Sequence, residues 1–296
     1  MIDRLGRPGP GLLSELRPGE PGYPRRLKDL RHPPDPLWLD GTLPDEAARS
    51  IAIVGTRRST PYGTRVAREV AGAVASAGAV VVSGLAQGID SVAHQAAIDA
   101  GGRSIAVLGE GLLAFDQSGP VRRRRLARAI RERGALVSEY GLDFGAQSWT
   151  FPRRNTTIAA LADVVVVIEA PTGSGALITA ERAIEIGRPV FAAPGPLGAS
   201  TWEGSNRYIS ERKAHLLLSA ADVLSRFGLA VTHLPDPPPR SGLVDRALDL
   251  LASGAADPDT IASSLGLPVA NVTTLIADML LKGRIVATGD GRFARV

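Results

Sequence analysis

Short apolar runs recur along the middle of the chain. Each is rich in β-branched side chains and is bounded by Gly, Ser or a charged residue. They cover residues 51–55, 79–84, 103–109, 135–139, 163–170 and 188–195. Runs without alternating polar positions are typical of strands that are buried on both faces. The pattern therefore predicts a sheet that lies inside the protein.

Helical spacing separates most of these runs. Apolar residues three to four positions apart mark the stretches 64–78 and 174–187, and each stretch ends at a glycine that can adopt the left-handed conformation of a helix C-terminus. Strands that alternate with helices indicate a parallel sheet with helices on both faces. The expected fold is α/β, an extended Rossmann-like, mostly parallel doubly wound sheet.

The two ends of the chain have a different composition. Residues 1–45 are rich in Pro and Gly and have no clear period, so we expect an irregular N-terminal arm that packs over the next domain through Leu37, Trp38 and Leu39. Residues 243–296 show the pattern of three helices followed by a hairpin, which is typical of a small winged-helix domain. The predicted organisation is an arm over 1–45, a Rossmann-like domain over 46–230, a stiff proline-rich linker over 231–242 and a winged helix over 243–296.

Composition narrows the possible classes of protein. The chain has 296 residues and no cysteine, which excludes disulfides, thiolate zinc sites and a cysteine nucleophile and fits a reducing cytoplasm. It has no apolar stretch near the roughly 20 residues that cross a bilayer and no export signal at residues 1–16, so we expect a cytoplasmic protein without membrane contact.

Positive charge is concentrated in one predicted helix. The net charge is +4 and the pI is about 9.8, and residues 121–134 hold seven arginines and one acid. Such a stripe attracts polyanions. Two interpretations of the segment from Arg122 to Arg133 stay open, a DNA contact and a solvated face, and we favour the solvated face.

Glycine-rich loops follow several of the predicted strands. Backbone amides and the positive end of a helix suit an anion there, and glycine lets a phosphate approach the main chain. The residues concerned are Gly84, Gly88, Gly173 and Gly175, with hydroxyls from Ser83, Ser174 and Thr179. Each loop alone could be a tight turn, but several at one sheet edge favour a phosphate-lined groove. Neither GxGxxG after the first strand nor GxxxxGK[ST] occurs, so we expect no NAD or ATP site.

Asp90 and His94 lie four residues apart at the start of a predicted helix. They could form an acid/base dyad, but no nucleophile or third metal ligand accompanies them. We favour a structural pair that pins the loop to the helix. Glu139 and Glu169, at strand ends, could each act as a base or hold an arginine of the groove, and Glu110 is not ranked.

The motifs together resemble a known family. The segments VGTRRSTPYG, VVSGLAQGIDSVAHQAAIDAGGRSIAVLGEGL, SEYG, FPRRNTTIAALADVVVVIEAPTGSGALITAERAIEIGRPVFAAPG and EGSNRYIS resemble the DNA-processing protein A family, called DprA or Smf, from about Leu37 to Leu224. The resemblance implies single-stranded DNA binding during natural transformation. It also implies a homodimer that protects incoming strands and helps to load the RecA recombinase on DNA coated with single-strand-binding protein. It implies no catalytic turnover, no metal and no cofactor.

The resemblance also implies which residues bind DNA. The motifs fall on Thr56 and Arg57 and on Phe151, Arg154 and Asn155. The chain departs from the family at residue 156, where Thr replaces the usual arginine, and the neighbouring Arg153 could supply that contact. The expected DNA-binding set is Thr56, Arg57, Ser83, Gly84, Gly88, Phe151, Arg153, Arg154, Asn155, Ser174 and Gly175.

Several questions stay open at the level of the sequence. Phe151 could stack on a base or pack in the core. The apolar residues of segment 209–224 could form a self-complementary dimer patch or finish the core. The winged helix has few basic residues on its third helix, which favours a protein-contact module or a weak holder of duplex DNA.

Two other classes of function remain as alternatives. One is a nucleotide-hydrolysing enzyme of the lysine-decarboxylase-like Rossmann type. The segment APTGSGALITAE matches the motif of those enzymes only in part, because it lacks the double glycine. The other is a winged-helix transcription regulator, against which the weakly basic third helix argues.

Overall fold

The computed structural model describes residues 13–230, 242–252, 254–288 and 290–296. The chain divides into two compact units, Met1–Leu234 and Pro235–Val296. The linker predicted over 231–242 lies, apart from Gly242, outside the described residues.

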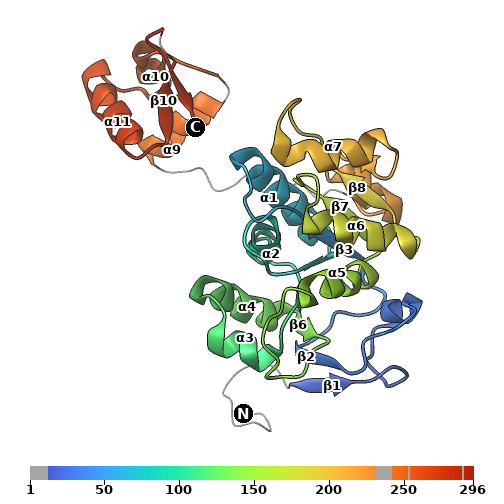
Figure 1. Ribbon diagram of the computed structural model, residues 1–296. Coiled ribbons are helices and arrows are strands. Elements are labelled where there is room, and N and C mark those ends of the chain that lie inside the picture. Colours follow the sequence, from blue (N-terminus) through green and yellow to red (C-terminus); the bar gives the residue numbers. More distant parts are fainter. Residues whose placement is uncertain (1–12, 231–241, 253, 289) are drawn as a thin grey trace. The chain divides into compact units, whose positions relative to one another are not determined.

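A nine-stranded sheet forms the centre of the first unit (Figure 1). Its parallel strands are β3 (Ser50–Val54), β4 (Val80–Ser83), β5 (Ser104–Leu108), β6 (Ala135–Ser138), β7 (Val164–Val167), β8 (Val190–Ala192) and β9 (His215–Leu216). All apolar runs that we predicted as strands coincide with β3 to β8, and these strands are buried along their whole length. The predicted mostly parallel α/β fold is therefore confirmed.

The N-terminal arm is more regular than we expected. β1 (Ser14–Leu16) and β2 (Leu37–Gly41) extend the sheet beyond β6 as antiparallel strands. Leu37 and Leu39 are buried in the core. The expected packing of this segment is therefore right, but its irregular conformation is wrong for residues 37–41. The Pro-rich surroundings hid a strand whose backbone groups are satisfied by β6.

A partly buried ion pair connects the arm to the domain. Arg26, in the short helix η1 (Arg25–Asp29), donates through Nε and Nη2 to the two oxygens of Asp163 at 3.1 and 2.9 Å. Asp163 also accepts a hydrogen bond from the amide of Ser50, where β3 begins. The paired carboxylate therefore links the arm, the sheet and the segment before β7.

Helices cover both faces of the sheet (Figure 1). One layer contains α1 (Pro61–Ser76), α2 (Ile89–Asp99), α3 (Leu112–Ser118), α4 (Val121–Arg133) and α8 (Ala221–Leu224), with the short helices η2 (Ser200–Trp202) and η3 (Ser225–Phe227). The other layer contains α5 (Thr150–Leu161), α6 (Gly175–Glu185) and α7 (Glu203–Ser210), with η1. Alternate side chains of one strand pack against the two helix layers. In β5, Ile105 and Val107 face one core and Ala106 and Leu108 face the other.

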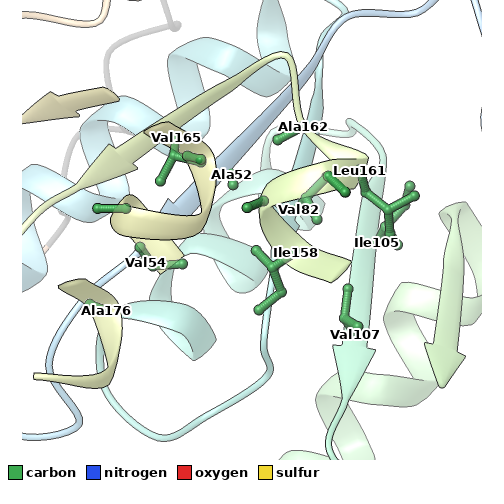
Figure 2. Packing of buried hydrophobic residues seen from close by; sticks show 14 of the residues in the cluster. Ala52, Val54, Val82, Ile105, Val107, Ile158, Leu161, Ala162, Val165 and Ala176 are labelled. Atoms are coloured by element: carbon green, nitrogen blue, oxygen red, sulfur yellow. The ribbon is translucent and has the colours of Figure 1, made fainter. Parts of the chain in front are cut away.

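Figure 2 shows why α5 has a fixed position on the sheet. Val54, Val82 and Val107, from three neighbouring strands, lie in the same core cluster as Ile158 of α5, and this cluster continues to Val165 of β7 and Ala176 of α6. Because α5 follows β6 and leads into β7, its first turn lies at the carboxyl ends of the parallel strands. This is the edge of the sheet where ligands bind in folds of this type.

The ends of the predicted helices follow their sequence signals. Thr60 caps α1 by accepting a hydrogen bond from the amide of Gly63 at 3.0 Å, and Gly78 follows the helix with φ of +81°. Ser174 caps α6, and Gly187 follows it with φ of +72°. Both glycines therefore have the left-handed conformation that we predicted.

The second unit is a winged helix with its own core. Three helices, α9 (Leu243–Ala252), α10 (Pro258–Leu265) and α11 (Val269–Leu281), precede the antiparallel pair β10 (Ile285–Ala287) and β11 (Phe293–Arg295). Leu248, Ile261, Val272, Ile276 and Met279 meet in the interior. The predicted C-terminal fold is confirmed.

In the part of the chain that the structure describes, no single helix has the length and apolarity that crossing a membrane requires. The helices α10 and α11 meet that requirement only as a pair bent by 109°.

Candidate nucleic-acid interface

A cleft opens where the strand order of the sheet reverses. From β3 the chain passes outward through β4, β5 and β6 and then returns to β7 on the other side of β3. The crevice outside the carboxyl ends of the strands at such a point is the usual ligand site of open α/β sheets. Here a cleft of about 630 Å³ is formed by loops that follow β3, β4, β6 and β7.

Most of the predicted DNA-binding residues line this cleft. They are Thr56, Arg57, Phe151, Arg154, Asn155, Ser174 and Gly175. Ser83, Gly84, Gly88 and Arg153 are not part of its lining. The topology therefore brings together residues that are up to 119 positions apart in the chain (56 to 175). The other four predicted residues lie outside the cleft lining.

Arg57 and Phe151 face each other across the cleft. The guanidinium carbon of Arg57 lies 5.4 Å from the ring centroid of Phe151, which is within cation–π distance. Arg57 is exposed and Phe151 is half-buried. The Phe151 ring rests on Gly109, where a β-carbon would come within 2.8 Å of its Cδ1 atom. Part of Phe151 therefore packs on the backbone and part lines the cleft, and its stacking on a base stays a prediction.

Gly88 holds two loops of the cleft together. Its φ is +88°, and a β-carbon would lie 2.3 Å from the carbonyl oxygen of Thr56. The amide of Ile89 donates to the same oxygen at 3.2 Å. The amide of Thr56 donates in turn to the backbone oxygen of Glu169 at 2.7 Å, at the end of β7. The backbone that carries Arg57 is thus fixed from two sides, and Gly88 acts through this packing.

Arg154 is buried beneath the cleft. Only 4% of the residue is exposed. Its Nη1 donates to the carbonyl oxygen of Gly84 at 2.7 Å and to that of Val107. A β-carbon at residue 84 would lie 2.6 Å from the same Nη1 atom, so the guanidinium requires glycine there. Burial lowers the pKa of Arg154 to about 10, partly offset by the nearby Asp90 carboxylate, so the side chain stays charged at neutral pH. Arg154 therefore joins the loop after β4 to strand β5 and contributes positive charge to the cleft, and a direct phosphate contact stays a prediction.

Asp90 and His94 both accept hydrogen bonds from the loop after β4, and not from each other. Asp90 accepts from the amides of Gly84 and Ala86 at 3.1 and 3.4 Å. His94 accepts from the amide of Leu85 at 3.3 Å through Nε2. Among the hydrogen bonds of the described residues, none joins the two side chains. Burial raises the pKa of Asp90 and lowers the pKa of His94 to about 3, so the imidazole is neutral. These contacts favour the structural interpretation of the pair.

Two of the side-chain groups that we expected to contact a phosphate form hydrogen bonds with backbone carbonyl oxygens instead. Ser83 is completely buried and donates to the carbonyl oxygen of Ile53 at 2.6 Å, so its hydroxyl does not reach the cleft. Asn155 donates to the carbonyl oxygen of Gly175 at 2.9 Å and thereby fixes the start of α6. The first turn of α6, with Ser174, Gly175 and Ala176, lines the cleft and directs the positive end of its dipole there.

The two other carboxylates also have structural partners. Glu139 accepts from Arg153 Nε at 2.9 Å and from the Thr157 hydroxyl at 3.0 Å. Glu169 is fully buried and accepts from the amide and the hydroxyl of Thr60 at 2.9 and 3.0 Å. Of the two roles that we considered for Glu139, the structure therefore shows the one of holding an arginine. Within the described residues, no group of three or more His, Asp or Glu side chains could hold a metal ion.

Known proteins match almost the whole chain. The family described as DNA recombination-mediator protein A matches residues 15–228, and the family described as DprA winged helix domain matches residues 232–291. The chain belongs to the DNA recombination-mediator protein A family. The resemblance that the motifs indicated is confirmed.

Relatives from distant bacteria resemble this family member at similar levels. The chain is 38% identical to the protein Smf of Escherichia coli over 91% of this chain and 74% of that protein. It is 36% identical to a putative DNA processing protein DprA of Mycobacterium tuberculosis over 92% and 71%, respectively. It is 39% identical to the DNA processing protein DprA of Streptococcus pneumoniae over 69% and 71%.

Solved structures of DprA proteins have the same fold. The X-ray structure of DNA processing protein A from Streptococcus pneumoniae matches with a TM-score of 0.66 and 36% identity, over 72% of this chain and 74% of that chain. A structure of DNA processing protein A from Helicobacter pylori, reported for its single-stranded DNA binding mode, matches with a TM-score of 0.63 and 28% identity, over 73% and 95%.

In this member of the DNA recombination-mediator protein A family, the sequence did not reveal the role of Arg123. This residue of α4 donates through Nε to the carbonyl oxygen of Leu85 at 2.7 Å, and its guanidinium carbon lies 5.2 Å from the ring centroid of Phe115. Arg124 and Arg131 of the same helix also bind inward, to the backbone and side chain of Asp116, respectively. The arginine-rich segment therefore has two faces, and the exposed one carries Arg122, Arg125 and Arg128.

The sequence analysis did not predict several other residues of the cleft. Arg58 and Ser148 line the cleft, and Gly109 supports the Phe151 ring. Arg58 follows Arg57 directly, so a search for adjacent basic residues would have found it. Ser148 and Gly109 carry no such signal, because their role depends on contacts between loops that are distant in the chain.

Proposed function

We propose that this protein binds single-stranded DNA in the cleft at the carboxyl ends of β3 and β7 and acts as a recombination mediator in natural transformation. The observation that carries the proposal is the exposed Arg57 guanidinium facing the Phe151 ring, 5.4 Å from its centroid, within that cleft. This pair offers a charged group for a phosphate and an aromatic face for a base.

The surroundings of the pair suit a polyanion of variable sequence. Arg58 and the first turn of α6 line the same cleft, and the buried Arg154 adds charge from below. Stacking on Phe151 does not depend on the identity of the base, because each base has a π-face. Binding should therefore tolerate any sequence and weaken as salt increases.

We propose that the protein is not an enzyme. The carboxylates that a nucleotide hydrolase would use, among them Asp90, Glu139 and Glu169, are bound to backbone amides, to a hydroxyl or to an arginine. Glu169 is fully buried, and the imidazole of His94 is neutral and bound to the loop. These contacts support a static binding surface over the alternative of nucleotide hydrolysis.

The proposed partners beyond DNA come from the family resemblance. They are the RecA recombinase, single-strand-binding protein and a second copy of this chain, in the cytoplasm. Of the segment 209–224, Leu217, Val223 and Leu224 complete the core, whereas Leu216 and Leu218 are 44% and 75% exposed. The exposed large apolar side chains that this segment offers to a dimer contact are therefore Leu216 and Leu218.

The winged helix fits a protein-contact module or a weak holder of duplex DNA. Its basic side chains Lys282, Arg284 and Arg295 lie within ion-pair distance of Asp278, Asp245 and Asp249, respectively. Such pairing leaves little uncompensated charge for a duplex, which argues against the alternative of a transcription regulator.

The test is a fluorescence-anisotropy titration of labelled oligo-dT with Arg57→Ala. We expect affinity to fall about 10- to 100-fold, because a charged hydrogen bond contributes roughly 1.5–3 kcal/mol. The matched control is Arg25→Ala, which removes the same charge from a side chain that is 83% exposed and, among the described residues, ion-paired with Glu46.

Unchanged affinity of a folded Arg57→Ala protein would remove this site from the proposal. Release of base or phosphate from nucleoside monophosphates, lost on Asp90→Asn, would favour the enzyme. Arg154→Ala would be a poor probe of binding, because Arg154 joins the loop after β4 to strand β5 and its loss would disturb the fold.

A further inference from the structure

Three aromatic rings gather on the loop that connects β6 to α5. Tyr140 and Phe144 are stacked, with ring centroids 5.4 Å apart and an interplanar angle of 21°. Trp149 meets both rings edge-on, at 5.8 Å from Tyr140 and 6.0 Å from Phe144. This arrangement leaves an aromatic surface that the cleft does not include.

The outer two rings are exposed although they are large and apolar. Trp149 is 53% exposed and Phe144 is 38% exposed, whereas Tyr140 beneath them is 6% exposed. The Tyr140 hydroxyl donates to the carbonyl oxygen of Thr150 at 3.0 Å, and burial raises its pKa to about 12, so it stays a neutral donor. The cluster thus has a buried base and an open outer side.

The loop beneath the rings is held by several hydrogen bonds. The amide of Phe144 donates to the Gly141 carbonyl at 2.9 Å, and the Phe144 carbonyl accepts from the amide of Gly111 at 2.8 Å. The amide of Thr150 donates to the Gln147 carbonyl at 3.1 Å. The rings are therefore arranged before any ligand arrives, which lowers the entropy cost of binding.

The cluster adjoins the proposed DNA cleft through its own chain. Ser148, the residue before Trp149, lines the cleft, and Phe151 lies two residues after Trp149. Arg153, one turn into α5, has a side chain that is 62% exposed and bonds Glu139 through Nε. Asp143 is the only acidic residue in the segment 141–149. A strand that leaves the cleft on this side therefore meets exposed aromatic faces with an exposed arginine nearby.

We infer that Trp149 and Phe144 form a second base-stacking platform, which binds unpaired bases of a single strand that continues out of the cleft over the loop between β6 and α5. The inference rests on the proposed function, because it assigns a longer path to the same ligand. Exposed aromatic side chains beside a basic groove are the feature by which proteins hold single strands without reading their sequence.

The test compares two lengths of oligo-dT on the full chain. An oligomer of about 5 nucleotides is the probe of the cleft, and one of about 20 nucleotides is the probe of the cleft together with the platform. We expect Trp149→Ala to weaken binding of the long oligomer about 5- to 100-fold, as the loss of one stacking contact would do, and to leave binding of the short one unchanged. Trp149→Tyr should restore the affinity, and Trp149→Leu, which keeps apolar bulk without a π-face, should not.

Intrinsic fluorescence gives a second readout that leaves Trp149 itself unaltered. The chain has three tryptophans. Trp202 is 1% exposed, so quenching by the long oligomer in the Trp38→Phe protein should come from Trp149. Leu197→Ala, at a fully exposed apolar residue on another loop, is the matched control and should leave both affinities unchanged.

The outcomes separate the two proposals. If neither oligomer binds the unaltered protein, the proposed function fails. If both bind and Arg57→Ala weakens both, but Trp149→Leu binds the long oligomer like the unaltered protein and no quenching occurs, the platform is wrong and the cleft stands.

Discussion

Three charged or polar side chains are buried at or beneath the floor of the cleft. Arg154, Asp90 and His94 each bind backbone groups of the loop after β4, from Gly84 to Ala86. Buried polar groups of this kind are costly unless each has a partner, so they fix one conformation of the loop. The shape of the cleft is therefore determined from below, by side chains that do not need to touch DNA.

The buried His94 makes the stability of the protein depend on pH. Burial lowers its pKa from 6.5 to about 3. As the pH falls from about 6.5 towards 3, the unfolded chain binds a proton that the folded protein does not. The free energy of unfolding should therefore decrease in this window, by up to about 1.4 kcal/mol per pH unit. Urea unfolding at a series of pH values measures this slope.

The replacement His94→Gln isolates the contribution of the imidazole. Asp90 acts in the opposite direction, because its raised pKa lets the folded protein bind a proton first as the pH falls. Both proteins contain Asp90, so its effect cancels in their difference. We expect the stability of the original protein relative to His94→Gln to decrease from pH 6.5 to pH 4, and parallel curves would contradict the neutral buried state of His94.

At the scale of elements, the contact between the loops after β3 and β4 requires a glycine. In Gly88→Ala, a β-carbon would meet the Thr56 carbonyl at 2.3 Å, and the backbone would keep an unfavourable positive φ. We expect this change to shift the loop that carries Arg57 and to lower both the affinity for oligo-dT and the melting temperature.

Gly187→Ala is the matched control for this prediction. Gly187 has φ of +72°, but a β-carbon there would meet no atom within 4 Å. It should cost only the conformational strain, about 1–2 kcal/mol, and leave the affinity unchanged. Equal effects of the two substitutions on DNA affinity would show that contact between the loops is unimportant.

The sequence predicted the elements better than it predicted the roles of polar side chains. Buried strands and glycine-terminated helices leave a local pattern, so β3 to β8, α1 and α6 were found. β2 was missed because its partner β6 lies far along the chain. Ser83 and Arg154 were predicted to bind DNA, but their hydrogen bonds to the carbonyl oxygens of Ile53 and Val107 depend on strand neighbours that no local pattern reveals.

For the whole molecule, the cleft and the aromatic platform lie entirely within the first compact unit. We therefore expect a chain of residues 1–234 to bind oligo-dT with nearly the affinity of the full chain. Plots of the logarithm of affinity against that of salt concentration should have the same slope for both, about −0.7 for each phosphate contacted. Anisotropy titrations from low to moderate salt provide the comparison, and a clearly shallower slope for the shortened chain would assign phosphate contacts to the winged helix.

The central sheet ends on both sides in very short strands. β1 has three residues and β9 has two, so each outer edge offers few backbone groups to another chain. Two copies could not join through a continuous sheet over any useful length. Self-association of this protein would have to depend on side-chain packing, which point substitutions can abolish without disturbing the backbone.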